Sequence, residues 1–196
     1  MKAPAFQRRV LLVPWLLAAL VMSSCATPAR DQDYTNSYRE ALSRFPGTEA
    51  DPGRVQQVVE EFIALFAGLD EKGELEERIS AVYAEELHFD DTLHIKGDRQ
   101  ELLRYLEHTG EQLKHIEVEL LGYSVSGPDI HVRWSMETTF TILGRTSSPR
   151  TLGMTHLRLD EEKRVVLQQD FWDTSRGALE HVPLAGGLVR WLRARF

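Results

Sequence analysis

The chain has 196 residues, a formal net charge of −7 and a single cysteine, Cys25. This length is enough for one domain with a sizeable core and little more. The acidic balance argues against nucleic acid as a partner, because phosphate binding needs a basic surface. One cysteine excludes an internal disulfide.

The N-terminus has the pattern of a bacterial export signal. Three basic residues come first, and an apolar run of 13 residues follows from Val10 to Met22, ahead of Cys25. The run is shorter than the ~20 residues that a membrane-spanning helix needs, but it suits a cleaved signal. The segment resembles a lipoprotein signal, which implies a signal peptide over 1–24 and a lipidated Cys25. An ordinary signal peptide with an incidental cysteine is the alternative.

Cleavage after residue 24 would remove three positive charges and no negative ones, and so leave a 172-residue chain of charge −10. The resemblance implies a lipid-anchored protein of the bacterial cell envelope. Ala26 after the cysteine favours the outer membrane, with the protein facing the periplasm.

Residues 25–53 are rich in Pro, Asp, Thr, Ser and Gly, which predicts a tether with one short helix near 35–44. Asp51 followed by Pro52 is a helix start, and apolar residues then recur at helical spacing up to Leu69. A shorter helix is expected near 73–84. A third helix begins at Asp98, where Glu101 completes a capping box.

After residue 113 the apolar period changes from 3.6 to two, and turn signals such as "SGPD" and "DEEK" separate the runs. Helices therefore come first and an antiparallel meander follows. This segregation predicts an α+β fold, with three N-terminal helices packed in the concavity of a curved antiparallel sheet.

The alternation within the strands predicts which side chains face the helices. In residues 130–140 the even-numbered positions, including Trp134, Met136 and Phe140, form the apolar face. If "DEEK" is a four-residue hairpin loop, Leu159 pairs with Arg164, and Asp170 enters the core on the face of Leu157. A five-residue loop would bring Met154 and His156 inward instead.

Three helices, then "YAEELHFDD", then a meander ending "DFWDTS" resemble the nuclear transport factor 2-like (NTF2-like) superfamily, whose SnoaL-like and ketosteroid isomerase-like members share a cone-shaped fold. The resemblance covers residues 54–175, which leaves 176–196 as a separate C-terminal segment. This fold hosts isomerases, dehydratases, cyclases, hydrolases and binding modules, so the resemblance implies no single activity.

The isomerase branch can be compared position by position. Its proton-shuttling aspartate falls at Asp91 and a pocket tryptophan at Trp172, but its two hydrogen-bond donors fall at Phe62 and Thr155. Phe62 cannot donate a hydrogen bond, and the loss of one such donor typically costs ~10²-fold or more in rate. The resemblance therefore does not imply steroid isomerase chemistry.

The candidate site is a mostly apolar pocket with a few polar groups, which suits a small hydrophobic ligand. Asp170 and Asp91 are the candidate catalytic acid and base, because apolar surroundings would raise a carboxyl pKa towards neutrality. The alternative is that the aromatic residues are ordinary core and that the acids bond to backbone N–H groups. The candidate ligand-binding residues are Phe62, Trp134, Met136, Phe140, Thr155, Gln168 and Trp172.

No metal or other cofactor is expected. The alternative is a metal site at "HFDDTLH", which places His88, Asp90, Asp91 and His94 close together in the sequence. The seven histidines contain no HExxH motif, and the sequence has no Gly-rich phosphate loop and no serine or cysteine nucleophile motif. Residues 176–196 end in a basic amphipathic stretch. That stretch either folds over its own domain, covering one mouth of the cone, or lies on anionic lipid.

Three functions follow. The first is a membrane-tethered SnoaL-like domain that binds a small hydrophobic molecule, such as a lipid or a polyketide-like compound. The second is an isomerase-, dehydratase- or cyclase-type enzyme that uses Asp170 or Asp91. The third is a protein-interaction module that forms a homodimer through its sheet. An internal cavity would favour the first two, and a filled core would favour the third.

Overall fold

The computed structural model describes residues 34–71, 73–142, 144–182 and 185–195. The predicted signal peptide, Cys25 and the first part of the predicted tether lie outside these residues. Among the helices of the described part, none is long and apolar enough to cross a membrane. Residues 38–196 form one compact unit.

Three helices come before the main strands, as predicted. Helix α3 (Pro52–Ala67) begins where Asp51 accepts a hydrogen bond from the Arg54 N–H at 3.1 Å. Helix α5 (Arg99–Gln112) begins where Asp98 accepts one from the Glu101 N–H at 2.8 Å, while the Glu101 carboxylate accepts from the Gly97 N–H. Such caps satisfy backbone donors that have no partner within the helix. Helix α4 (Leu75–Val82) is shorter than predicted.

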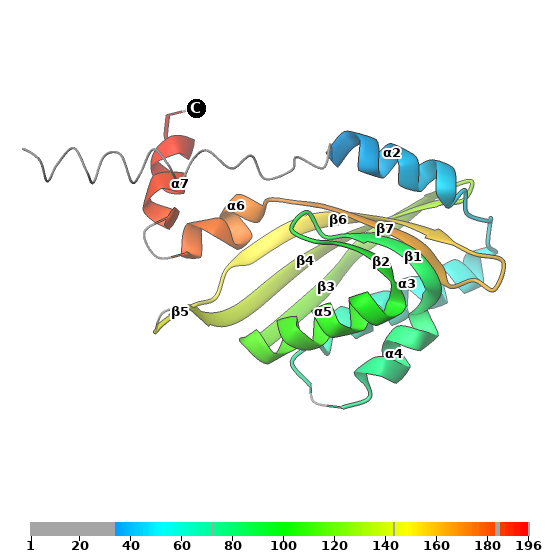
Figure 1. Cartoon of the computed structure of the whole chain (residues 1–196), viewed down its shortest axis with the longest axis horizontal. Helices are drawn as coiled ribbons and strands as arrows, with labels where there is room; N and C mark the ends of the chain where they lie inside the picture. Colours follow the sequence, from blue (N-terminus) through cyan, green and yellow to red (C-terminus); the bar gives the residue numbers. More distant parts are fainter. Residues whose placement is uncertain (1–33, 72, 143, 183–184, 196) are drawn as a thin grey trace, which may run out of the picture. The chain divides into compact units, whose positions relative to one another are not determined.

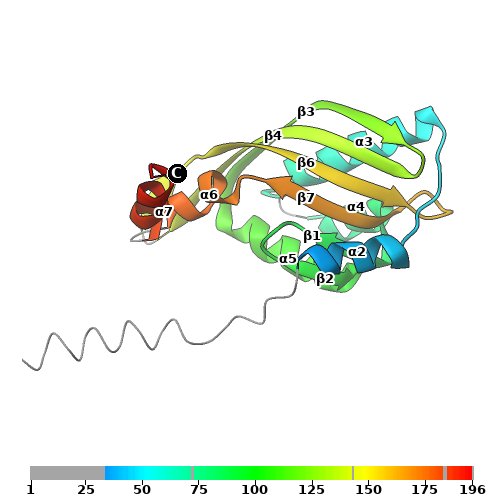
Figure 2. The ribbon, with the colours of Figure 1, turned by 90° about the horizontal axis from the view of Figure 1, so that it is seen from above.

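The sheet has the strand order β2-β1-β7-β6-β4-β3, and β5 pairs with β4. Figure 2 shows β3, β4, β6 and β7 side by side in a curved sheet. The α+β prediction is confirmed, with one difference: β1 pairs with β7 in parallel, so the sheet is mixed. The strands are β1 (Tyr83–Asp90), β2 (Ile95–Asp98), β3 (Leu113–Ser126), β4 (Asp129–Ile142), β5 (Arg145–Ser147), β6 (Arg150–Leu159) and β7 (Val165–Trp172).

The predicted faces are confirmed, although the predicted pairing of Leu159 with Arg164 is wrong. Leu159 pairs with Val165, and a bulge next to it brings Thr155 opposite Asp170. Beyond the bulge, each β6 residue pairs two residues further along β7 than predicted, so that Thr155 faces Asp170 and not Gln168. A shift of two residues leaves every side chain on its predicted face. Asp170 therefore enters the core as predicted.

Helices α3, α4 and α5 lie on the inner face of the sheet (Figure 1), where the main core forms. Val59 of α3, Leu102 of α5 and Val132 of β4 are fully buried in this core. Burial of one such aliphatic side chain typically contributes about 1.5–3 kcal/mol. The core thus holds the helices against the sheet, and the site described below lies at one end of it.

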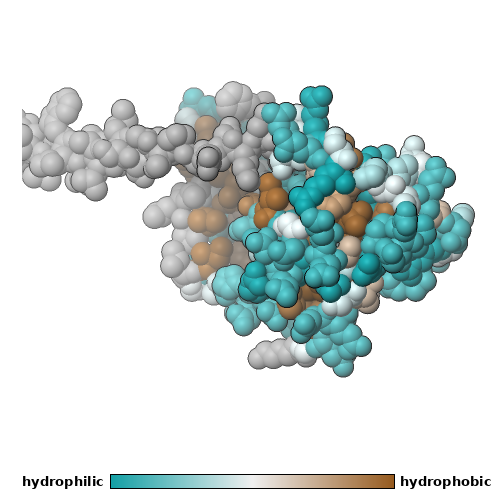
Figure 3. All heavy atoms as spheres, turned by 45° about the vertical axis from the view of Figure 1, so that its right-hand side comes forward, coloured by the Kyte–Doolittle hydropathy of each residue, from teal (hydrophilic) through white to brown (hydrophobic). Residues whose placement is uncertain are grey.

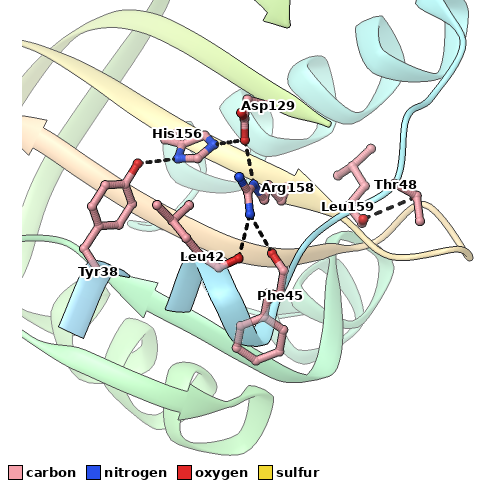
Figure 4. Close-up of polar contacts among 8 residues, drawn as sticks. All are labelled: Tyr38, Leu42, Phe45, Thr48, Asp129, His156, Arg158 and Leu159. Carbon is pink, nitrogen blue, oxygen red and sulfur yellow. Dashed lines mark hydrogen bonds and ion pairs between the residues drawn. The ribbon is translucent and has the colours of Figure 1, made fainter. Parts of the chain in front are cut away.

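Helix α2 (Tyr34–Arg44) confirms the predicted short helix, and its residues from Tyr38 onwards pack on the outer face of the sheet. Tyr38 O–H lies 2.7 Å from His156 Nδ1, and His156 Nε2 lies 2.8 Å from Asp129 Oδ1 (Figure 4). Arg158 donates to Asp129 and to the main-chain oxygens of Leu42 and Phe45. We call Tyr38, Asp129, His156 and Arg158 the outer-face cluster.

The C-terminal residues form α6 (Thr174–Gly177), the 3₁₀ helix η1 (Leu179–His181) and α7 (Ala185–Arg193). Asp173 caps α6 as its position predicts, because its carboxylate accepts from the Arg176 N–H at 3.1 Å. This bond and one from the Ser175 hydroxyl lower the Asp173 pKa, with Ser175 the larger cause.

Candidate functional site

A cavity of about 220 Å³ lies between α3, α5, α6 and the inner face of the sheet. Most of its wall is apolar. Its polar wall residues are Asp91, Tyr105, Thr109, Thr138, Thr151, Thr155 and Asp170.

Most of the predicted site residues line this cavity. Both predicted acids, Asp170 and Asp91, do so. Of the predicted ligand-binding residues, Gln168 does not; it is fully buried and bonds to Asp170 instead. Whether the others bind a ligand stays a prediction. Those that line the cavity are Phe62, Trp134, Met136, Phe140, Thr155 and Trp172.

Asp170 lies on β7, where its carboxylate accepts hydrogen bonds from the side chains of Thr155 and Gln168. Thr155 Oγ1 is 2.6 Å from Oδ1, and Gln168 Nε2 is 3.2 Å from Oδ1 and 3.1 Å from Oδ2. Trp134 Nε1 donates to Thr155 Oγ1 at 2.9 Å, so the Thr155 hydroxyl proton is directed at the carboxylate. The Tyr83 hydroxyl donates to Gln168 Oε1, which fixes the amide with its N–H groups towards Asp170.

Burial raises the pKa of Asp170 to about 7, against the opposing effect of the Thr155 bond, and the nearby charge of Asp91 raises it further. Neither Thr155 nor Gln168 offers this acid an acceptor in the present arrangement. When Asp170 is neutral, its proton can therefore be donated to a molecule in the cavity, which this side chain lines. A carboxyl with a pKa near 7 exchanges protons in both directions at neutral pH, as a general acid or base must.

Asp91 has a structural role and also contacts the cavity. Its Oδ1 accepts from the N–H groups of Leu93 and His94, which fixes the turn between β1 and β2. Its Oδ2 accepts from the Tyr105 hydroxyl, and its main-chain oxygen accepts from Trp172 Nε1 at 2.8 Å. The turn and the aromatic wall are thus held together through this one residue.

Burial and the charge of Asp91 raise the pKa of Tyr105. This tyrosine therefore stays a neutral hydrogen-bond donor, and its present acceptor is Asp91.

Four polar wall residues were absent from the sequence prediction: Tyr105, Thr109, Thr138 and Thr151. The spacing of two of them, Tyr105 and Thr151, was informative. Tyr105 follows Leu102 by three residues on α5, and this places it on the buried face. Thr151 lies two and four residues before Gly153 and Thr155, on the same face of β6. The Thr151 hydroxyl oxygen is buried and has no hydrogen-bond partner among the described residues, so it is a candidate contact for a ligand in the cavity.

Phe62 and Thr155, the positions to which the sequence comparison assigned the two isomerase donors, both line the cavity. Phe62 contributes only a ring to the wall, where it packs against Phe66 with ring centroids 5.0 Å apart. The hydroxyl of Thr155 donates to Asp170.

No metal centre forms among the described residues, because no three His, Cys, Asp or Glu side chains gather there. In "HFDDTLH" the side chains have other contacts. His88 lies 3.4 Å from Gln169, and His94 lies against the Tyr105 ring.

Comparison with known proteins gave a match at the level of structure. No family model matches the sequence, and no curated protein matches it. Among solved structures, a protein described as a SnoaL-like polyketide cyclase from Shewanella denitrificans is 17% identical with a TM-score of 0.55, over 64% of this chain and 94% of that one. An NTF2-like protein from an Exiguobacterium species is 14% identical with a TM-score of 0.51, over 59% of this chain and 98% of that one. The chain has the NTF2-like fold.

The NTF2-like fold is shared here by proteins of different described activities. An epoxide hydrolase of M. tuberculosis is 14% identical with a TM-score of 0.52, over 73% of this chain and 95% of that one. At such identities the likeness establishes the fold alone. What this NTF2-like chain does must be argued from its own cavity.

Proposed function

We propose that this protein is a membrane-tethered NTF2-like domain that binds a small hydrophobic molecule in the cavity between α3, α5 and the sheet. The observation that carries the proposal is the cavity itself: an apolar space of about 220 Å³ with Asp170, Asp91 and Thr151 in its wall. A filled core would have favoured an interaction module. The descriptions of solved structures with this fold, a cyclase and an epoxide hydrolase, support a role with small molecules.

The cavity constrains the ligand by size and polarity. Its volume is below the roughly 300–1,000 Å³ of pockets that enclose drug-sized ligands. It therefore suits a compact molecule, or one end of a longer lipid or polyketide-like molecule whose remainder leaves through the mouth. Leu93, 48% exposed, marks this mouth because it both lines the cavity and contacts solvent.

The tether is proposed from the sequence, because Cys25 lies outside the described residues. The basic start, the short apolar run and the cysteine favour lipidation and a place in the bacterial cell envelope. Metabolic labelling with a palmitate analogue tests this point. Incorporation should be lost in Cys25→Ser.

Binding is tested with 2-naphthol, a compact apolar probe with one hydroxyl, by isothermal titration calorimetry. Met136→Trp fills the cavity and should weaken binding at least tenfold. Leu152→Trp is the matched control, because Leu152 is 67% exposed on the opposite face of β6. Equal binding by the two variants would contradict the cavity as the site. Native mass spectrometry of the chain from a homologous host would then identify any co-purifying natural ligand.

An enzyme is the second candidate, and the Asp170 environment favours it. A buried carboxyl with a pKa of about 7 and an available proton can abstract or deliver a proton at a bound substrate. Proton abstraction, dehydration or ring closure would each fit. Asp91 is the candidate partner across the cavity, with its Tyr105 hydrogen bond replaced or shared in the complex.

Deuterium exchange separates a carrier from a catalyst. The co-purified ligand is incubated with the protein in D₂O and its carbon-bound deuterium is measured by mass spectrometry. An enzyme should incorporate deuterium with the wild type and lose at least 100-fold in rate with Asp170→Asn, while binding is retained. Binding without exchange in the wild type would identify a carrier.

A further inference from the structure

The C-terminal helix α7 presents an apolar face to solvent. Leu188 is 59% exposed, Trp191 52% and Leu192 42%. Trp191 and Leu192 follow Leu188 by three and four residues, which places all three on one side of the helix. Isolated exposed apolar residues are ordinary on a protein surface, but three large ones on one face of a nine-residue helix are a marker of binding. We call Leu188, Trp191 and Leu192 the α7 face.

The α7 face lies beside positive charge on a protein that is acidic as a whole. Residues 185–195 contain Arg190, Arg193 and Arg195 and no acidic residue, while the chain has a net charge of −7. The Arg195 guanidinium lies 4.6 Å from the centroid of the Trp191 ring, so a cation adjoins the apolar face directly. Figure 3 shows, by contrast, a face of the molecule on which hydrophilic residues predominate.

Helix α7 is held in place before any partner arrives. Arg193 pairs with the Glu180 carboxylate, Arg190 donates to the Glu180 main-chain oxygen at 2.8 Å, and the Gly186 N–H donates to the Val182 oxygen at 2.8 Å. A Cβ at Gly186 would lie 2.0 Å from the Glu180 oxygen, so this close approach needs glycine. These contacts attach α7 to the segment around η1, while the α7 face stays exposed.

An apolar face with tryptophan and flanking arginines matches the boundary of an anionic bilayer. Leucine and tryptophan side chains enter the region between head groups and acyl chains, and arginines meet lipid phosphates. We propose that the α7 face docks on an anionic lipid surface. This inference depends on the surface alone, and it holds whether or not the cavity binds a ligand.

Docking would have a geometric consequence. Gly177 and Ala178, which directly precede η1, line the cavity, and His181 of η1 contacts the Phe140 ring edge-to-face at 6.0 Å. The end of the domain that meets the lipid is therefore the end that carries these parts of the cavity wall.

A site-resolved probe tests the proposal in the full chain. Cys25→Ser removes the only cysteine and the lipid, and Leu188→Cys then takes the environment-sensitive fluorophore NBD. Phosphatidylcholine vesicles with about 30% phosphatidylglycerol should raise and blue-shift its emission at least twofold over pure phosphatidylcholine vesicles. The matched control carries NBD at Glu162→Cys in the β6–β7 hairpin, where the native side chain is 66% exposed. The N-terminal apolar segment is common to both proteins. A difference in their NBD emission on vesicles therefore reports lipid contact at the α7 face.

The role of the Arg195 charge is tested separately, in the protein that carries NBD at Leu188→Cys. Arg195→Glu should weaken its binding to the anionic vesicles several-fold, since each basic residue near such a surface contributes roughly fivefold. Arg104→Glu on α5 is the control and should have no such effect. Equal responses at positions 188 and 162, or a response at 188 unaffected by lipid charge and by Arg195→Glu, would overturn the proposal. A blue shift without vesicles that grows with protein concentration would also overturn it and indicate pairing with a second copy.

Discussion

Thr155 donates its hydroxyl proton to Asp170 across 2.6 Å, and it does so because its own oxygen accepts from the Trp134 indole N–H. The three residues form a directed chain of hydrogen bonds from the aromatic wall to the carboxylate. The chain opposes the effect of burial on Asp170 and keeps the pKa of this acid near neutrality instead of higher. Several predictions about the cavity depend on this relationship.

Thr155→Val removes the hydroxyl at nearly constant volume. We expect the pKa of Asp170 to rise above about 7, because a bond that favours the ionised form is lost. Carbon-13 NMR titration of the aspartate carboxyl groups measures it, and Thr155→Ser should restore the wild-type value. An unchanged or lower pKa in Thr155→Val would show that the hydroxyl does not stabilise the carboxylate.

Asp170 should make the protein more stable at low pH than at high pH. Its pKa is about 7 when folded and 3.8 as a free side chain, so the folded state binds the extra proton between these values. The stabilisation is fully present below about pH 4 and is lost as pH rises through 7, on the order of 4 kcal/mol at most. In urea unfolding, Asp170→Asn should therefore lose less stability than the wild type between pH 5 and pH 8. Parallel curves for the two proteins would contradict this.

Gly153→Ala tests how tightly the aromatic wall is built. A Cβ at this position would lie 2.2 Å from the Trp134 ring, so the indole must move and its bond to Thr155 must break. We expect a loss of about 1–3 kcal/mol in unfolding free energy, typical of an overpacked core, with a change in tryptophan fluorescence. Gly97→Ala is the control, because among the described residues beyond its chain neighbours no atom lies within 4 Å of its added Cβ. Similar losses in the two variants would refute this account.

Arg158→Met should loosen α2 without unfolding the domain. Arg158 holds the end of this helix through the main-chain oxygens of Leu42 and Phe45, at 2.9 and 3.0 Å. Hydrogen–deuterium exchange over residues 38–46 should rise at least tenfold, while exchange in α3 is unchanged. Arg150→Met, which breaks an exposed pair with Glu137, should leave both segments as they are.

Low pH should also loosen residues 38–46, through protonation of His156. Burial lowers the pKa of this histidine below its usual 6.5, although the Asp129 bond opposes the shift. The unfolded state thus binds its proton more readily, and the stability that His156 contributes is present above pH 6.5 and lost as pH falls. Exchange over residues 38–46 should rise between pH 7 and pH 5 after correction for the intrinsic rate. His156→Gln should flatten this dependence.

The sequence was most informative where one physical rule acted alone. Asp51 and Asp98 cap helices because short acids before a helical period satisfy free N–H groups, and both predictions are confirmed. The alternation around Trp134 fixed one face of β4, and the outcome agrees. The position of Asp170 inside the core followed from the same period of two.

Other features depended on partners far away in the chain. The bulge beside Leu159 changes the hairpin register, and no local turn signal encodes it. Tyr83 was expected at the end of a helix, but it begins β1 and bonds to Gln168, 85 residues away. The outer-face cluster joins Tyr38 to His156 across 118 residues. Composition alone marked the segment around Tyr38 as a tether.

The packing of residues 38–45 on the sheet bears on self-association. Ala41 and Phe45 are buried against Val166 and Leu167, so the outer face of β7 is already partly occupied within one chain. A homodimer formed back-to-back through this sheet would have to displace the helix or use the remaining strip, where Leu152 and Met154 are exposed. The helix thus acts as an intramolecular competitor. Assembly through the part of this face that α2 covers and attachment of α2 should exclude each other.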